Sequence, residues 1–236
     1  MFKEQLLKDA LRLYAGQHVL DRVLREGRQA LEYTTVRQVM TVMFIDFADI
    51  FPADFSGLTP DMLRSWRQGH HELVAECVAE HEGIVDTLMG DAVIAHWGMT
   101  PQVDHAALAL RCAEKLQAEV SAIDAHHQAR GLPGRRLMMG IHSGMVDLGN
   151  HGTPNRARYT VMGDAVNLAS RLANRCNEYR VPALLTDAAL ALAGNAVATS
   201  EVDAIRVKGK DGKVTLHTLG KGYVRREASP LPSAPG

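Results

Sequence analysis

The chain has 236 residues, of which 46% are hydrophobic and 22% are charged, and its 26 Lys and Arg nearly balance its 27 Asp and Glu. These values are those of an ordinary globular protein that is long enough to bury its own core. They argue against a protein built for nucleic acid, which would carry a strong basic excess. The sequence also lacks the run of about 18 apolar residues that a membrane-spanning helix needs.

The cysteines and the first residues bear on where the protein works. The three cysteines, Cys77, Cys112 and Cys176, are odd in number and far apart, which favours reduced thiols over disulfides. The opening stretch MFKEQLLKDALRLY has charges throughout and lacks the apolar core of a secretory signal. Together these features predict a cytoplasmic protein.

Composition divides the chain into three zones. Residues 1–38 carry leucines and valines at roughly helical spacing and predict one or two helices that form a linker into a domain. Residues 39–222 alternate short β-rich runs with longer helical runs and form the predicted domain. Residues 223–236 include the proline-rich stretch ASPLPSAPG and predict a disordered tail.

The pattern of apolar residues predicts the elements of the domain in chain order. They are a strand over 39–45, a helix over about 59–83, hairpin arms over 84–88 and 92–97, a helix over about 104–129, strands over 137–142 and 146–148, a helix from 164, and late strands over 184–186, 205–207 and 214–219. This order predicts an α+β fold with a ferredoxin-like βαββαβ core, extra C-terminal strands and a preceding N-terminal helical linker.

Two acidic residues are candidates for holding a metal ion. Asp46 ends the first predicted strand, and Asp91 lies in the turn of the hairpin that should pair beside it. Two carboxylates at one sheet edge can bind Mg²⁺ together with substrate phosphates. Alternatively, each residue only stabilises a turn. Asp49 competes with Asp46 but falls outside the predicted strand, so we rank it lower.

The stretch YTVMGDAVNLASRL, residues 159–172, contains a second group of candidates. Asp164 is expected to cap the helix that follows Gly163. Asn167 and Arg171 are then four residues apart on one helix face, where an amide and a guanidinium suit a sugar and a phosphate. The alternative is an amphipathic helix with an ordinary surface arginine.

Histidines are numerous, at 11, but no HExxH motif is present. His70-His71 and His126-His127 are adjacent pairs on predicted helices. Neighbouring residues on a helix point about 100° apart, so neither pair can converge on one metal ion by itself. We interpret them as solvated or half-buried histidines.

Five stretches occur in an order and spacing that resemble the catalytic domain of the class III adenylyl and guanylyl cyclases. They are TVMFID (41–46), MGDAVIAHWG (89–98), GIHSGMVDLGN (140–150), YTVMGDAVNLASRL (159–172) and VKGK (207–210). Residues 13–38 are also similar to the helical linker that couples an upstream sensor to the catalytic dimer in many bacterial members of this family.

The resemblance implies roles for individual residues. Asp46 and Asp91 match the aspartates that bind two Mg²⁺ or Mn²⁺ ions. Asn167 matches the residue that orients the ribose, and Arg171 matches the residue that stabilises the pentavalent phosphate. Lys208 matches the residue that contacts the terminal phosphates, and Lys210, two residues later, is the alternative for this role. It further implies a homodimer in which each site takes the aspartates from one chain and the remaining groups from the other.

The positions that select the base depart in part from the family pattern. Thr87 stands four residues before Asp91, where adenine-selective enzymes usually have a lysine. Thr160 occupies the second position, where threonine is common in bacterial adenylyl cyclases. Asp86 is expected to face the other side of its strand from Thr87, because side chains alternate along a strand.

The resemblance therefore implies an enzyme that converts a nucleoside triphosphate, most readily ATP, into the 3′,5′-cyclic monophosphate and pyrophosphate. Two alternatives remain open. The first is a cyclase that uses GTP or a pyrimidine triphosphate. The second is a cyclase-like dimer that binds nucleotide or transmits a signal without turnover.

Overall fold

The structure is a computed structural model, and it describes residues 2–49, 59–100, 104–129, 135–207 and 212–224. Its helices are α1 (Phe2–Ala15), α2 (Gln17–Glu26), α3 (Pro60–Glu80), α4 (His105–Gln128), α5 (Asp164–Tyr179) and α6 (Asp187–Ala193), with a 3₁₀ turn over Gly27–Leu31. Its strands are β1 (Thr35–Asp49), β2 (Ile84–Met89), β3 (Ala92–Trp97), β4 (Arg135–Thr153), β5 (Arg156–Met162), β6 (Ala183–Thr186), β7 (Thr199–Arg206) and β8 (Lys213–Leu219).

One sheet holds all of these strands, in the order β2-β3-β1-β4-β6-β8-β7, with β5 paired to the outer half of β4. The β2-β3-β1-β4 portion is antiparallel throughout and has the strand order of a ferredoxin-like fold. Strand β6 joins β4 in parallel, and β8 and β7 extend the sheet beyond it. The predicted α+β fold class with extra C-terminal strands is therefore confirmed.

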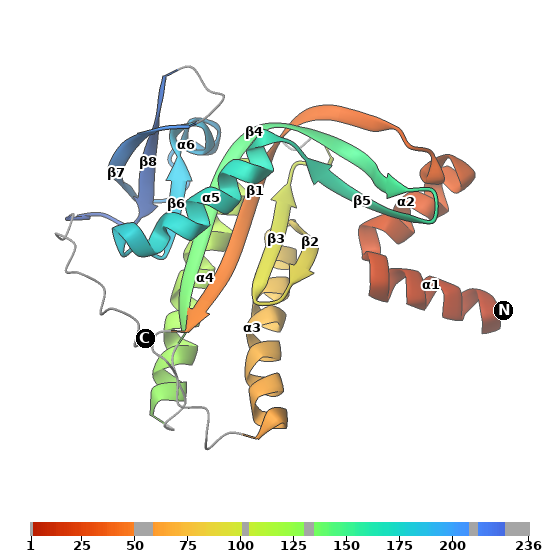
Figure 1. Ribbon diagram of the computed structural model, residues 1–236, viewed down its shortest axis with the longest axis horizontal. Helices are drawn as coiled ribbons and strands as arrows, with labels where there is room; N and C mark the ends of the chain where they lie inside the picture. Colours follow the sequence, from red (N-terminus) through yellow and green to blue (C-terminus); the bar gives the residue numbers. More distant parts are fainter. Residues whose placement is uncertain (1, 50–58, 101–103, 130–134, 208–211, 225–236) are drawn as a thin grey trace, which may run out of the picture.

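Helices cover the two faces of the sheet differently (Figure 1). The side chains of Met43, Ile45 and Phe47 on β1 belong to a core built with α3, α4 and α6. Met40 and Val42, at the alternate positions, pack instead in a cluster with α5. Because β1 is buried on both faces, its sequence is an almost uninterrupted apolar run.

Helix α5 packs directly against the sheet at Gly140 on β4. A Cβ atom added to Gly140 would lie 1.9 Å from the carbonyl oxygen of Ala169 and 2.4 Å from the backbone nitrogen of Ala173. Only glycine allows this contact, so the glycine determines how closely α5 packs against β4.

Strand β4 differs from the prediction of two strands over 137–142 and 146–148. It is one continuous strand, and Ser143 and Gly144 stay in register opposite Thr41 and Met40 of β1. The sequence Ser-Gly is typical of a turn, but here pairing with a long neighbouring strand overrides that local preference. Strand β5 was not predicted, and β1 begins at Thr35 rather than at residue 39.

The N-terminal zone forms two helices, as predicted, and they lie at the far tip of the β4–β5 ribbon (Figure 1). Helix α1 buries none of its residues. Helix α2 contacts β5, because the guanidinium of Arg22 lies 4.1 Å from the ring centre of Tyr159. The division at residues 38 and 222 stays a prediction, and the predicted tail falls almost wholly outside the described residues.

The three cysteines are buried and free, in agreement with the predicted reduced thiols. Among the described residues, no helix combines the length and the apolar character needed to cross a membrane.

Candidate active site

Asp46 and Asp91 lie at the same end of the sheet. Ile45 of β1 pairs with Val93 of β3, so each aspartate is within two residues of this pair. Asp46 is half-buried, and its Oδ1 accepts a hydrogen bond from the backbone N–H of Phe47 at 2.9 Å. The hairpin turn places Asp91 next to the end of β1, as the sequence predicted.

The carboxylate of Asp91 faces two arginines. Nη2 of Arg135 lies 2.8 Å from its Oδ2, and Nε of Arg67 lies 3.9 Å from its Oδ1. The buried Arg135 side chain also donates to the carbonyl oxygen of Phe47 at 3.0 Å. Asp91 is thus turned toward the α3–α4 face, whereas strand alternation places Asp46 on the opposite face of β1.

The donor chemistry of the two aspartates fits Mg²⁺ or Mn²⁺, since both ions prefer carboxylate oxygens. In the structure, Asp91 is neutralised by Arg135 instead. A metal ion shared by Asp46 and Asp91 therefore requires the Asp91 carboxylate to turn away from this arginine.

The two predicted base-selecting residues meet at Asp86. The hydroxyl of Thr87 donates to Oδ2 of Asp86 at 2.6 Å, and the hydroxyl of Thr160 donates to the same oxygen at 2.8 Å. The expectation that Asp86 faces away from Thr87 is wrong. Strand β2 has an irregularity in register between Val85 and Thr87, which places Asp86 at a bulge and breaks the alternation of side chains.

Asp86 lies in a buried polar cluster that sequence reasoning missed. Burial alone would raise the pKa of its carboxyl, but His96, with Nε2 at 3.7 Å from Oδ1, and the hydroxyls of Thr87 and Thr160 outweigh this effect and lower the pKa. The Arg158 guanidinium on β5 donates to Thr87 Oγ1 at 2.7 Å. No sequence motif marks Arg158, because its contact with β2 depends on how the β4–β5 ribbon folds back.

Helix α2 packs close to this cluster. A pocket of about 270 Å³ is lined by His18 and Arg22 from α2, His96 from β3 and Tyr159 from β5. Burial lowers the pKa of His18, and the neighbouring His96 contributes to the same effect. Helix α2 is therefore in physical contact with β5, the strand that carries Thr160.

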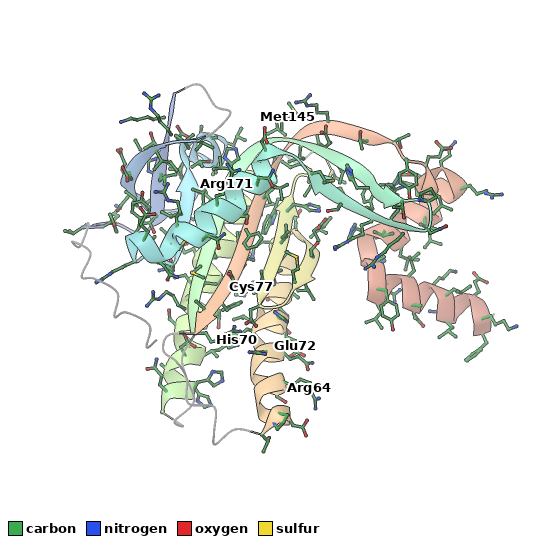
Figure 2. The ribbon with its side chains drawn as sticks, viewed as in Figure 1. Arg64, His70, Glu72, Cys77, Met145 and Arg171 are labelled. Carbon is green, nitrogen blue, oxygen red and sulfur yellow. The ribbon has the colours of Figure 1, made fainter. Side chains whose placement is uncertain are left out.

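Asn167 and Arg171 project from α5 and are exposed (Figure 2 labels Arg171). Within the described residues, neither side chain makes a hydrogen bond or an ion pair. Arg171 lines a pocket of about 280 Å³ together with Val207, the residue before Lys208. Lys208 itself, like Lys210, lies outside the described residues.

The start of α5 differs from the prediction. Gly163 is the N-cap, with φ of 134°, and Asp164 is the first helical residue, without a side-chain capping bond. Only glycine adopts this backbone conformation readily, so the capping position falls one residue earlier than expected. Asp164 still places its negative charge at the positive end of the helix.

Comparison with known proteins identifies relatives that match most of this chain. The family model described as "Adenylate and Guanylate cyclase catalytic domain" matches residues 32–221. Adenylate cyclase 1 of Rhizobium meliloti is 31% identical over 223 residues, which cover 92% of this chain and 33% of that protein. An adenylate cyclase of Anabaena cylindrica is 28% identical over 186 residues, which cover 76% of this chain and 36% of that protein. The chain thus spans about a third of the length of these relatives.

Solved structures share the fold of this chain. The adenylyl cyclase CyaB from P. aeruginosa has a TM-score of 0.70 at 23% identity, covering 82% of this chain and 99% of that chain. The guanylyl cyclase Cya2 has a TM-score of 0.67 at 25% identity, with the same coverage of both chains. The family match covers residues 32–221, and the solved structures share the fold. The chain therefore belongs to the adenylate and guanylate cyclase catalytic-domain family.

Proposed function

We propose that this chain is a nucleotidyl cyclase that converts ATP into 3′,5′-cyclic AMP and pyrophosphate at sites shared by two copies of the chain. The observation that carries the proposal is the exposure of the Asn167 and Arg171 side chains. Both are exposed on α5 and make no hydrogen bond or ion pair within the described residues, so both are available to a ligand. Arg171 borders the pocket next to Val207, where Lys208 follows in the sequence.

In the proposed reaction, the 3′-oxygen of the ribose attacks the α-phosphorus in line and pyrophosphate leaves. Asn167 orients the ribose, and Arg171 stabilises the negative charge that grows on the α-phosphoryl oxygens. Lys208 contacts the terminal phosphates. Asp46 and Asp91 would hold Mg²⁺ or Mn²⁺, which would lower the pKa of the 3′-hydroxyl and offset the negative charge of the triphosphate.

A homodimer is part of the proposal. Asp46 and Asp91 lie at one end of the sheet, and no hydrogen bond or ion pair among the described residues joins them to Asn167 or Arg171. A two-fold axis can bring the aspartates of one chain to α5 of the other and thereby create two equivalent sites. Helices α1 and α2 would then carry signals from an upstream sensor or partner. The buried free thiols fit a cytoplasmic setting.

The hydroxyls of Thr87 and Thr160 support ATP as the substrate. Each donates its only proton to Asp86, so each offers only lone pairs to a base. The exocyclic amine of adenine is a donor, whereas the exocyclic oxygen of guanine is an acceptor. Arg158, which contacts Thr87, has further N–H groups, and a ring nitrogen of adenine is an acceptor for such a donor.

GTP is the second candidate, and Asp86 is the observation in its favour. A carboxylate can accept hydrogen bonds from the ring N–H and the amine of guanine. However, the side chain of Asp86 is only 2% exposed, so guanine reaches it only if Thr87 and Thr160 move. ATP therefore remains the proposed substrate, and a pyrimidine triphosphate has no comparable support.

The test is to incubate the purified chain separately with each of the four nucleoside triphosphates and Mg²⁺ or Mn²⁺, and to identify the products by mass spectrometry. Cyclic AMP as the main product supports the proposal, and cyclic GMP as the main product supports the second candidate. Nucleotide binding without any cyclic product, in a dimer with intact fold, would establish a non-catalytic binding module instead.

A further inference from the structure

Two imidazoles and one carboxylate meet between α3 and α4. The ligand atoms of His70, Asp124 and His127 all lie within 4.8 Å of one another. His70 is on the side of α3 that faces α4, and the ring centres of His70 and His127 are 6.0 Å apart (Figure 2 labels His70). Three potential metal ligands therefore converge at a place that the proposed cyclase reaction does not use.

The sequence pattern explains why these three side chains meet. Asp124 and His127 are three residues apart on α4 and share one helix face. His70 belongs to the inward stripe of α3 that continues with Val74 and Cys77, and all three are at most 1% exposed. The adjacent pairs His70-His71 and His126-His127 each contribute one ring. Considering each pair by itself overlooks a site made from one member of each pair. The interpretation of these residues as solvated or half-buried is wrong for His70, whose side chain is buried.

The carboxylate of Asp124 is fixed in place by the neighbouring strand. Its Oδ1 accepts a hydrogen bond from the backbone N–H of Arg135 at 3.1 Å. Asp124 is 9% exposed, and burial raises the pKa of its carboxyl even though Arg135 and the two imidazoles oppose this effect. A bound cation would compensate for the burial of this carboxylate.

The two imidazoles of the group border a pocket at the surface, whereas the Asp124 carboxylate lies behind them. A pocket of about 390 Å³ opens between the two helices, and its lining includes Ser65 and Gly69 from α3 together with His70, His126 and His127. The pocket therefore offers an approach to the two imidazoles, and it has room for water as a further ligand.

We propose that His70, Asp124 and His127 bind one divalent transition-metal ion of the zinc class. Two imidazole nitrogens and one carboxylate oxygen are a ligand set typical of Zn²⁺, with water in the fourth position. Imidazole favours Zn²⁺, Co²⁺ or Ni²⁺ over Mg²⁺, which prefers oxygen ligands. Tetrahedral zinc needs donor atoms about 3.3 Å apart, so distances of up to 4.8 Å between the donor atoms must shorten by up to about 1.5 Å through rotamer adjustments.

This site is distinct from the aspartates at the sheet end, but one residue connects the two. Arg135 donates its backbone N–H to Asp124 and directs its guanidinium to Asp91. The ring of Phe47 packs against His70, with ring centres 4.9 Å apart, and also lies under the Arg135 guanidinium. The zinc-class site and Asp91 thus share one supporting arginine, although the binding proposal itself does not depend on cyclase activity.

The test uses the full chain without a polyhistidine tag, stripped with a chelator and titrated with Co²⁺ and Zn²⁺ alone. We expect one ion per chain, the intense visible absorption of four-coordinate cobalt, and displacement of Co²⁺ by Zn²⁺ but not by excess Mg²⁺. His127→Gln and Asp124→Asn should each weaken Zn²⁺ binding by more than about 10-fold, since loss of even an outer partner of a zinc site costs that much.

His126→Gln is the matched control, because His126 is exposed and adjacent to His127 on the same helix. It should leave the cobalt spectrum and the affinity unchanged, and circular dichroism verifies the fold of every variant. The proposal is overturned if the wild-type chain binds no Zn²⁺, if cobalt shows only the weak spectrum of an octahedral ion, or if His126→Gln weakens binding as much as His127→Gln.

Discussion

Nη2 of Arg135 lies 2.8 Å from Oδ2 of Asp91, and this ion pair joins the first residue of β4 to the turn of the β2–β3 hairpin. The two partners differ in exposure: the Arg135 side chain is fully buried, whereas the Asp91 side chain is 32% exposed. The pair therefore has a structural role in addition to the proposed role of Asp91 as a metal ligand. Asp46 has no such ion pair among the described residues.

Replacing the two aspartates should have different effects on stability. Asp91→Ala removes a charged hydrogen-bond partner of the buried Arg135 guanidinium, so it should lower the free energy of unfolding by about 1.5–3 kcal/mol. Asp46→Ala removes one local hydrogen bond and should cost about 1 kcal/mol. Both variants should lose cyclase activity. Urea denaturation and a cyclic-nucleotide assay measure the two effects.

Asp49→Ala is the control for the metal assignment and should retain activity. If Asp49→Ala were inactive and Asp46→Ala active, the wrong residue of β1 would have been assigned. Equal stability of Asp91→Ala and the wild-type chain would show that the ion pair with Arg135 does not stabilise the fold.

Gly140→Ala should displace α5 and lower activity. The added Cβ would lie 1.9 Å from the Ala169 carbonyl oxygen, and overpacking of this kind costs about 1–3 kcal/mol or more. The matched control is Gly69→Ala on α3, where a Cβ would meet nothing within 4 Å. That variant should raise helix stability by about 0.5–1 kcal/mol. Thermal unfolding distinguishes the two, and an unaffected Gly140→Ala would contradict the close packing of α5.

Selection between ATP and GTP should respond to the residues around Thr87. Thr87→Lys places the usual donor at this position and should sharpen the preference for ATP by about 5- to 150-fold, the equivalent of 1–3 kcal/mol. Arg158→Ala should loosen the preference, because it removes the guanidinium that contacts Thr87. Competition assays with both triphosphates measure the ratio of kcat/KM. Unchanged ratios in both variants would mean that other groups read the base.

The acid stability of the chain should depend on Asp86. The pKa of its carboxyl is lower in the folded chain than in the unfolded chain, so the unfolded chain binds more protons as the pH falls. The stabilisation is fully present above the ordinary aspartate pKa of about 3.9 and is lost as the pH falls through the folded value. The stability difference between the wild-type chain and Asp86→Asn should therefore shrink on acidification. A difference that stays constant from neutral to acidic pH would contradict this linkage.

Much of the fold could be predicted because its signals are local. Each of three patterns predicts the element in which it occurs. They are the apolar run before Asp46, the turn at Gly90 and Asp91, and the helical spacing in α5. The order of these elements was then sufficient for the ferredoxin-like core. Helix α3 begins at Pro60, within one residue of the predicted start at about residue 59.

The missed features all depend on contacts between distant segments. The bulge at Asp86 arises from the pairing of β2 with β3, and it brings Asp86 to Thr160, 74 residues away. Arg135 reaches Asp91 only because β4 starts beside the hairpin turn. His70 and His127 come from separate helices, and the pattern within either helix contains no sign of the other.

The most direct test of the central claim is subunit complementation. Asp46→Ala and Arg171→Ala should each be inactive, whereas an equal mixture, exchanged into mixed dimers, should recover about a quarter of the wild-type activity, because half of the dimers contain one intact site of two. Cyclic-nucleotide formation in the mixture, with heterodimers verified by native mass spectrometry, gives the answer. Recovery establishes a site that takes Asp46 from one chain and Arg171 from the other. Absence of activity despite verified heterodimers would contradict the shared site.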